Sequence, residues 1–170
     1  MTDQDLDGSH IKGLGINLFQ SEWPSLAQLP GFIGFMNTPI LKARKGTQEL
    51  VFYNEGEYNK WKSSMSEKEL DTWTIKYFKG LGTSTSTEFK EYFANKKIVN
   101  FTQGPVTDDS IDKIFTKKRP DDRKTWLENY DKTRFLNTSK PEVQYEEFID
   151  NEMIHFSKYD CERSIPNMMD

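Results

Sequence analysis

The hydrophobic pattern of this sequence changes its period near residue 104, and this change indicates the fold class. Before that point, apolar and polar residues alternate along 73–77, which is the two-residue period of a β-strand. After it, Ile149, Met153 and Phe156 recur at the spacing that places side chains on one face of a helix. The sequence therefore predicts an α/β chain in which a mixed part precedes a mainly helical part.

Turn and cap residues divide the sequence into shorter elements. A helix after the N-terminal acidic run is predicted to end at Trp23-Pro24, and a capping box at Thr85 and Glu88 is predicted to begin another. The remaining predicted elements are a hairpin over 38–53 that turns at 45–47, a helix over 55–62, a strand over 73–77, a turn over 79–82, a helix that has Pro120 in its first turn, and a loop over 137–141.

Composition narrows the class of protein. The 170 residues carry a formal net charge of −4, so contact with nucleic acid has to come from local basic clusters rather than from bulk charge. One cysteine, Cys161, excludes an internal disulfide framework and fits a reducing compartment. The sequence has no apolar run of membrane-spanning length and no signal-peptide pattern, so we expect an intracellular protein without a membrane partner.

Three carboxylates at alternate positions form the most distinctive local motif: Asp3, Asp5 and Asp7. In an extended segment all three would project to the same side and repel one another unless a cation neutralised them. Ligands that are all oxygen suit Mg²⁺, Mn²⁺ or Ca²⁺. The alternative is a polar turn before a helix with Asp7 or Ser9 as the N-cap, but strict alternation of three carboxylates favours a metal site.

An EF-hand is a competing interpretation of the same motif. A twelve-residue calcium loop that started at Asp3 would end at Leu14, where an EF-hand needs a bidentate carboxylate. His10 would occupy its usually apolar eighth position. The sequence therefore disfavours an EF-hand.

Two segments are candidates for contact with DNA. The turn Lys79-Gly80-Leu81-Gly82 offers backbone amides and a lysine to a phosphate, although a plain turn explains it equally well. The densest basic run is either a solvated helix face or a phosphate-binding surface. Its members are Lys117, Lys118, Arg119, Arg123 and Lys124.

Several motifs together resemble one enzyme family. The run 2–14 closely resembles the acidic toprim motif of eukaryotic type II DNA topoisomerases. Further matches follow in family order at 23–26, 77–86, 121–127 and 162–166, so the resemblance covers nearly the whole sequence. It implies that 1–103 is the C-terminal part of a Rossmann-like toprim domain with a hairpin insertion. It also implies that 104–170 is a helical segment that leads to a winged-helix domain outside this sequence.

The resemblance also implies a function: part of the DNA-cleavage core of an ATP-dependent type IIA topoisomerase. Members of this family cut and religate double-stranded DNA transiently, work as homodimers, and bind ATP in a domain not included in this sequence. The cofactor expected here is Mg²⁺, with Mn²⁺ or Ca²⁺ as alternatives. The expected location is the nucleus for a cellular enzyme, and a viral source is the other possibility.

Site residues follow from the same resemblance. Asp3 and Asp5 would be metal ligands, and Asp7 a weaker ligand that acts through water. Arg123 and Lys124 would contact the DNA backbone, with Lys79, Lys117 and Lys118 as further candidates. The family's upstream metal-binding glutamate and its catalytic tyrosine have no counterpart in this sequence, so no nucleophile is assigned and the isolated chain is expected neither to cleave nor to relax DNA.

Two other functions remain open at this point. One is another toprim enzyme, such as a primase or a nuclease, although the matches around Gly80 and at 121–127 argue against it. The other is a metal- or DNA-binding module without catalytic activity. The sequence departs from the family pattern at Gly15, where an apolar residue is usual, and at 131–141, which is shorter than usual.

Overall fold

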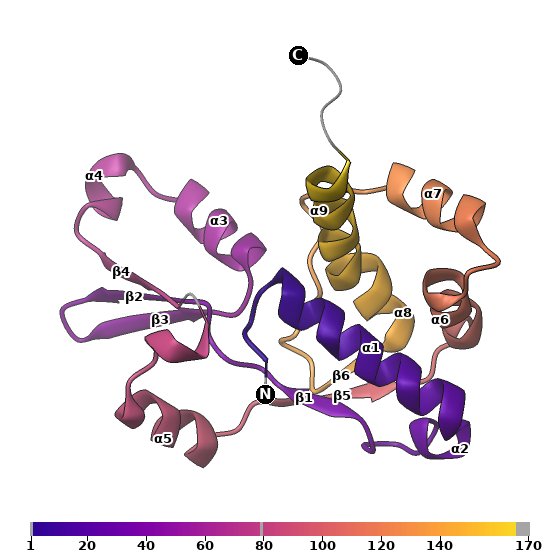
Figure 1. The fold of residues 1–170 in the computed structure, drawn as a ribbon. Coiled ribbons are helices and arrows are strands. Elements are labelled where there is room, and N and C mark those ends of the chain that lie inside the picture. Colours follow the sequence, from indigo (N-terminus) through magenta and orange to yellow (C-terminus); the bar gives the residue numbers. More distant parts are fainter. Residues whose placement is uncertain (1, 79, 166–170) are drawn as a thin grey trace. The chain divides into compact units, whose positions relative to one another are not determined.

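The computed structural model describes residues 2–78 and 80–165, which divide into two compact units (Figure 1). Unit one combines the segment up to Asp5 with Phe35–Ile98, and unit two combines Leu6–Gly34 with the segment from Val99 onward. The fold is α/β, as the sequence predicted. The units interleave along the chain and do not follow a single boundary near residue 104, so the assignment of 1–103 and 104–170 to separate domains stays a prediction.

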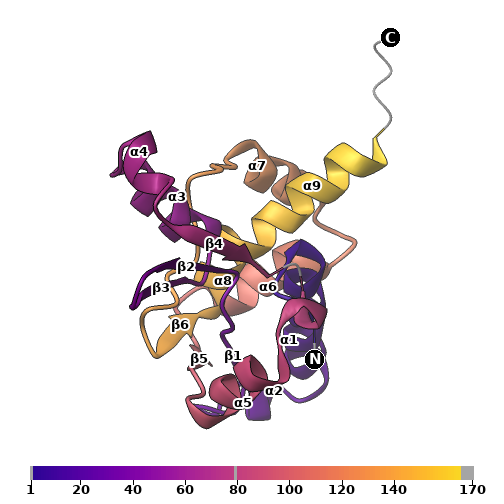
Figure 2. The same ribbon diagram turned by 90° about the vertical axis from the view of Figure 1, so that its left-hand side faces the viewer.

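The sheet of unit one is antiparallel and has the strand order β3-β2-β4 (Figure 2). Its strands are β2 (Leu41–Lys45), β3 (Gln48–Phe52) and β4 (Thr74–Tyr77). Ala43 in the central strand pairs with Leu50 on one side and Ile75 on the other. Gly46 turns the hairpin with a φ of 59°, a value that glycine adopts without steric cost. The predicted hairpin and strand are therefore confirmed.

Aromatic side chains cover one face of this sheet. Ile40, Leu41, Ala43 and Phe52 form the buried cluster, and α3 (Glu55–Ser63) brings Tyr58 and Trp61 onto it. The ring centroids of Phe52 and Trp61 lie 5.2 Å apart. The short helix α4 (Glu67–Leu70) follows α3 and precedes Trp73, which also packs on the cluster.

The capping box predicted from Thr85 and Glu88 is present at the start of α5 (Ser86–Ala94). The Glu88 backbone N–H donates to Thr85 Oγ1 at 3.3 Å, and the Thr85 N–H donates to Glu88 Oε2 at 2.7 Å. A single 3₁₀ turn, η1 (Leu81–Thr83), lies between β4 and α5. Reciprocal capping satisfies backbone donors that the helix itself leaves unpaired.

Unit two is mainly helical. Its first helix, α1 (Leu6–Glu22), ends just before Trp23, as predicted. Pro24 opens a further short helix, α2 (Pro24–Ala27), which was not predicted. Figure 1 shows α1 running past α9 (Ile154–Ser164), with which it is in contact. The later helices are α6 (Thr107–Phe115), α7 (Pro120–Glu128), α8 (Tyr145–Phe148), the π-helical turn η2 (Ile149–Met153) and α9 (Ile154–Ser164).

A second sheet has the strand order β1-β5-β6, and none of its three strands was predicted. It contains β1 (Gly34–Met36), β5 (Ile98–Thr102) and β6 (Glu142–Gln144). β5 and β6 pair in parallel, with Phe101 opposite Val143, and both side chains are buried. Between residues 105 and 165, the regular elements are therefore helices except for the short strand β6.

Close packing explains one of the two glycines inside α1. A Cβ on Gly13 would lie 2.6 Å from the sulfur of Met153, so the Met153 side chain could not keep its position beside any other residue at 13. A Cβ on Gly15 would meet nothing within 4 Å. Among the helices in the described part of the chain, none is long and apolar enough to cross a membrane.

Candidate metal-binding segment and nucleic-acid contacts

The acidic motif is not extended over its whole length. Asp3 and Asp5 precede α1 in unit one, whereas α1 begins at Leu6 and places Asp7 in its first turn, in unit two. The prediction that all three carboxylates project from one extended segment is therefore wrong for Asp7. A carboxylate in the first turn of a helix interacts favourably with the helix dipole, which gives Asp7 a structural reason for its position. Since α1 starts before both Asp7 and Ser9, neither residue is its N-cap.

Asp3 lies against the turn that follows β4, although the two are far apart in the sequence. The turn residue Gly80 has a φ of 99°. A Cβ built on Gly80 would lie 2.7 Å from Oδ2 of Asp3 and 3.0 Å from Oδ1, so the carboxylate touches the turn backbone. Lys79 of the same turn lies outside the described residues, and its predicted contact with phosphate stays a prediction.

The rest of the acidic segment passes the end of β4. Burial is the largest cause that raises the pKa of Tyr77 above its ordinary value, and the carboxylates of Glu55 and Asp5 raise it further. Gln4 Nε2 donates to Oδ1 of the buried Asn37 at 3.2 Å. Asp3 and Asp5 thus lie in the same unit as the turn that contains Gly80. The sequence alone did not predict that these two segments come together.

The carboxylates of this segment have the chemistry that a hard cation requires. Mg²⁺ is commonly held by one or two carboxylates that are completed by water and phosphate oxygens, and Asp3 and Asp5 are both exposed. Within 2–78 and 80–165, no cluster of three or more His, Cys, Asp or Glu side chains is arranged to hold a metal ion. A pair of carboxylates fits Mg²⁺, and its assignment to Asp3 and Asp5 stays a prediction.

In unit two, a polar clamp fixes the start of α1. Glu152 Oε1 in the π-helical turn accepts hydrogen bonds from Ser9 Oγ at 2.8 Å and from Lys12 Nζ at 2.7 Å. The side chains of Lys12 and Glu152 are 17% and 19% exposed, so water screens this pair only partly. The helix turn that carries Asp7 is thereby attached to η2.

Arg163, to which the sequence assigned no role, lies in α9 of the same unit. Its guanidinium donates to Asp160 at 2.6 Å and lies 5.2 Å from the ring centroid of Tyr159. The hydrogen bond with Asp160 is the main cause that raises the pKa of Arg163, and the negative charge of Asp7 adds to it. Asp7 therefore acts electrostatically on a cation of its own unit.

Two arginines of the basic run make contacts within the fold. Arg119 forms ion pairs with Asp109, Asp112 and Asp122. These contacts raise the pKa of Arg119, and the hydrogen bond with Asp122 contributes most. Arg123 Nη1 donates to the carbonyl of Lys113 at 3.2 Å and to that of Thr116.

These bonds of Arg123 satisfy carbonyls at the C-terminal end of α6, which helices leave unpaired. Arg123 therefore has a structural role in joining α6 to α7. The lysines of the run differ, because all three are exposed: Lys117, Lys118 and Lys124.

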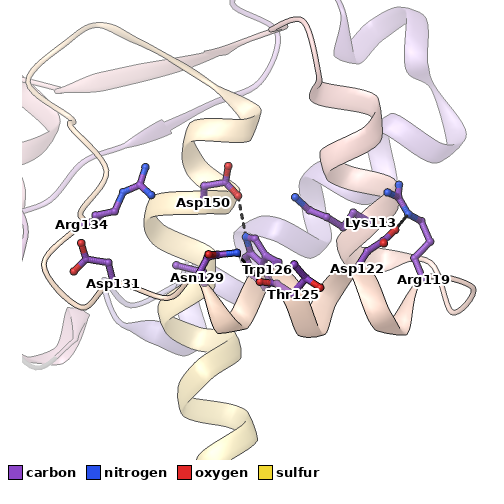
Figure 3. Close-up of a pocket in the computed structure, with 10 residues that line it drawn as sticks. Lys113, Arg119, Asp122, Thr125, Trp126, Asn129, Asp131, Arg134 and Asp150 are labelled. Carbon is purple, nitrogen blue, oxygen red and sulfur yellow. Dashed lines mark hydrogen bonds and ion pairs between the residues drawn. The ribbon is translucent and has the colours of Figure 1, made fainter.

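A polar cavity of about 420 Å³ lies between α7 and the start of α9 (Figure 3). Trp126 Nε1 donates to Asp150 Oδ1 at 2.8 Å on its wall. Its charged lining residues are Lys113, Arg119, Arg134, Asp122, Asp131 and Asp150. Since cations and carboxylates are balanced there, the cavity has no charge preference for a phosphate backbone, and the exposed lysines remain the better candidates for DNA contact.

The comparisons with known proteins agree with the resemblance. Residues 36–161 match the family described as the C-terminal associated domain of TOPRIM. DNA topoisomerase 2 of Plasmodium falciparum is 49% identical over 173 residues, and that of Arabidopsis thaliana is 47% identical over 175. Each alignment covers 100% of this chain and 12% of the relative.

A solved structure shows the same fold. The crystal structure of the Plasmodium falciparum topoisomerase II DNA-binding, cleavage and re-ligation domain superimposes with a TM-score of 0.88 at 47% sequence identity. The match covers 100% of this chain and 23% of that one. The chain thus spans about an eighth of the length of the curated relatives it matches. It belongs to the family of the C-terminal associated domain of TOPRIM, and its sequence and fold are those of the corresponding segment of eukaryotic DNA topoisomerase II.

Proposed function

We propose that this chain supplies divalent-metal ligands and DNA-backbone contacts to the cleavage core of a type IIA DNA topoisomerase. Support comes from the similarity to a cleavage and re-ligation domain and from the packing of Asp3 against the turn at Gly80, which joins two of the motifs that carry the family resemblance. Hydrolysis of ATP, homodimer formation and action in the nucleus belong to the whole protein in this proposal.

Within this function, Asp3 and Asp5 present carboxylate oxygens to the cation. Both residues belong to unit one, and Asp3 lies against the turn at Gly80. Asp7, at the start of α1, contributes through water and through the local negative charge. A bound Mg²⁺ would stabilise negative charge that develops on a DNA phosphate. The tyrosine that attacks DNA belongs to another part of the enzyme, and no tyrosine of this chain is assigned that role.

Contact with DNA falls to the exposed lysines of the α6–α7 turn and of α7. Lys117, Lys118 and Lys124 can each neutralise a phosphate without selecting a sequence. Arg123 contributes indirectly, because its bonds to the end of α6 fix the geometry of the turn between the two helices. Lys79 is proposed as a further phosphate contact beside the acidic segment.

The test is Asp3→Asn in the full-length enzyme that contains this segment, with Mg²⁺-dependent cleavage of plasmid DNA as the assay. Asp71→Asn is the matched control, because Asp71 is an exposed aspartate of unit one outside the acidic segment. We expect Asp3→Asn to lower cleavage on the order of a hundredfold and Asp71→Asn to leave it unchanged. Asp7→Asn should fall between them. Normal cleavage by Asp3→Asn, or loss of the metal-free fold, would show that the carboxylate is structural.

A further inference from the structure

The backbone of the turn after β4 has a conformation that only glycine adopts readily. Gly80 has a φ of 99°, in the left-handed region where a side chain is strained. The turn is closed at this residue, since the Gly80 carbonyl accepts a hydrogen bond from Thr83 N–H at 3.2 Å and another from Thr83 Oγ1 at 2.7 Å. A group placed on Gly80 therefore cannot be accommodated by a small shift of the turn alone.

The space that a side chain of residue 80 would occupy is already filled by Asp3. A Cβ there would lie 2.7 Å from Oδ2, 2.8 Å from Cγ and 3.0 Å from Oδ1, all inside normal van der Waals contact. The acidic segment is fixed nearby as well, because Gln4 binds Asn37, whose backbone N–H donates to the Lys97 carbonyl at 2.8 Å. The atoms in contact belong to the Asp3 side chain, so a clash is relieved by rotation of this side chain while the hydrogen bonds of the turn are kept.

We infer that Gly80 is a positioning residue for Asp3: the missing side chain lets the turn hold the Asp3 carboxylate in the orientation that binds the divalent cation. This inference rests on the proposed function, because it presumes that Asp3 is a metal ligand. A methyl group at position 80 displaces the carboxylate. Gly80→Ala is therefore expected to weaken binding of the cation, while the stability of the fold falls only by the cost of the strained backbone.

Two other glycines provide matched controls within unit one. Gly46 also has a positive φ, of 59°, but a Cβ there would meet nothing within 4 Å, so Gly46→Ala introduces backbone strain without a clash. Gly82 lies in the same turn region as Gly80, and a Cβ there would also meet nothing within 4 Å. Gly82→Ala therefore adds a methyl group next to the site without touching Asp3.

The experiment compares these three variants with Asp3→Asn in the full-length enzyme. Mg²⁺ binding is measured by titration calorimetry without DNA, the Mg²⁺ concentration for half-maximal plasmid cleavage is measured separately, and the melting temperature is recorded without metal. We expect Gly80→Ala to weaken Mg²⁺ binding roughly tenfold or more, as the loss of groups that orient metal ligands does. Its melting temperature should fall about as far as that of Gly46→Ala, while both controls keep normal Mg²⁺ binding.

The outcomes separate this inference from the proposed function. If Asp3→Asn binds Mg²⁺ and cleaves normally, the metal site itself is wrong. If Asp3→Asn fails but Gly80→Ala binds Mg²⁺ like Gly46→Ala, only the positioning role is wrong. If Gly80→Ala melts far below Gly46→Ala, Asp3→Ala in the same protein should recover the difference, and a lack of recovery would overturn the inference.

Discussion

Glu88 offers a sharp test of how α5 is attached to the sheet of unit one. Its carboxylate accepts hydrogen bonds from Lys76 Nζ at 2.7 Å, from Thr85 N–H at 2.7 Å and from Thr85 Oγ1 at 3.0 Å. Burial by itself raises the pKa of Glu88, but the bonds from Lys76 and Thr85 outweigh it and lower the pKa from 4.5 to about 2. The charged form is therefore favoured in the folded state.

The magnitude follows from this pKa. A lowering from 4.5 to about 2 corresponds to roughly 3 kcal/mol of preference for the charged form. The Lys76 side chain is 42% exposed, so solvent screens the ion pair, and we expect about 1 to 2 kcal/mol of the free energy of unfolding. Because the folded-state pKa is the lower one, this contribution is fully present above pH 4.5 and is lost as the pH falls toward 2.

The assay is urea unfolding followed by circular dichroism at pH 7 and at pH 2.5, on the native chain and on Glu88→Gln. At pH 7 the variant should be less stable by about 1 to 2 kcal/mol, and at pH 2.5 most of that difference should disappear. Glu91→Gln is the control, since Glu91 lies on the same helix and is exposed. A difference that is equal at both pH values, or equal for both variants, would refute the argument that the bound charge of Glu88 attaches α5 to the sheet.

Three further predictions concern unit two. Gly13→Ala should lower the free energy of unfolding by about 1 to 3 kcal/mol, because its methyl group would overlap the buried sulfur of Met153. Gly15→Ala should raise the free energy of unfolding by up to about 1 kcal/mol, and chemical denaturation measures both changes. Glu152→Gln should cost about 1 to 2 kcal/mol in the same assay, and Glu162→Gln, which breaks an exposed ion pair, less than about 0.5 kcal/mol. Lys124→Ala should reduce the slope of log affinity for DNA against log salt by about 1 in the full-length enzyme without a change in melting temperature; an unchanged slope would mean that this lysine does not meet a phosphate.

Local elements could be predicted from the sequence because their signals are local. The hairpin follows from alternation on both sides of Gly46, and the start of α5 follows from a capping box that closes within four residues. In both cases, the residues that determine the structure are neighbours in the sequence, so no long-range contact had to be known.

What the sequence did not predict depends on contacts between distant segments. β6 has only three residues, and it is a strand because β5 pairs with it in parallel, a pairing with no local signature. The contact between Asp3 and Gly80 is of the same kind. The alternation of the acidic motif led to a wrong prediction, since it indicated an extended segment up to Asp7, whereas α1 begins at Leu6. Arg123 was identified from its charge, whereas its backbone partners are visible only in the fold.

Asp3 and Asp7 are held by contacts in different units, so the effects of disturbing each contact can be measured separately. Asp3 is held within unit one by the glycine turn, whereas the helix turn that carries Asp7 is held within unit two by Glu152. A change at Gly80 therefore acts on the carboxylate with the larger proposed role in metal binding. A change at Glu152 acts on the start of α1. If Asp7 contributes only through water, Glu152→Gln should lower stability while leaving Mg²⁺ affinity nearly unchanged. Gly80→Ala differs in the second respect, because it should weaken Mg²⁺ binding.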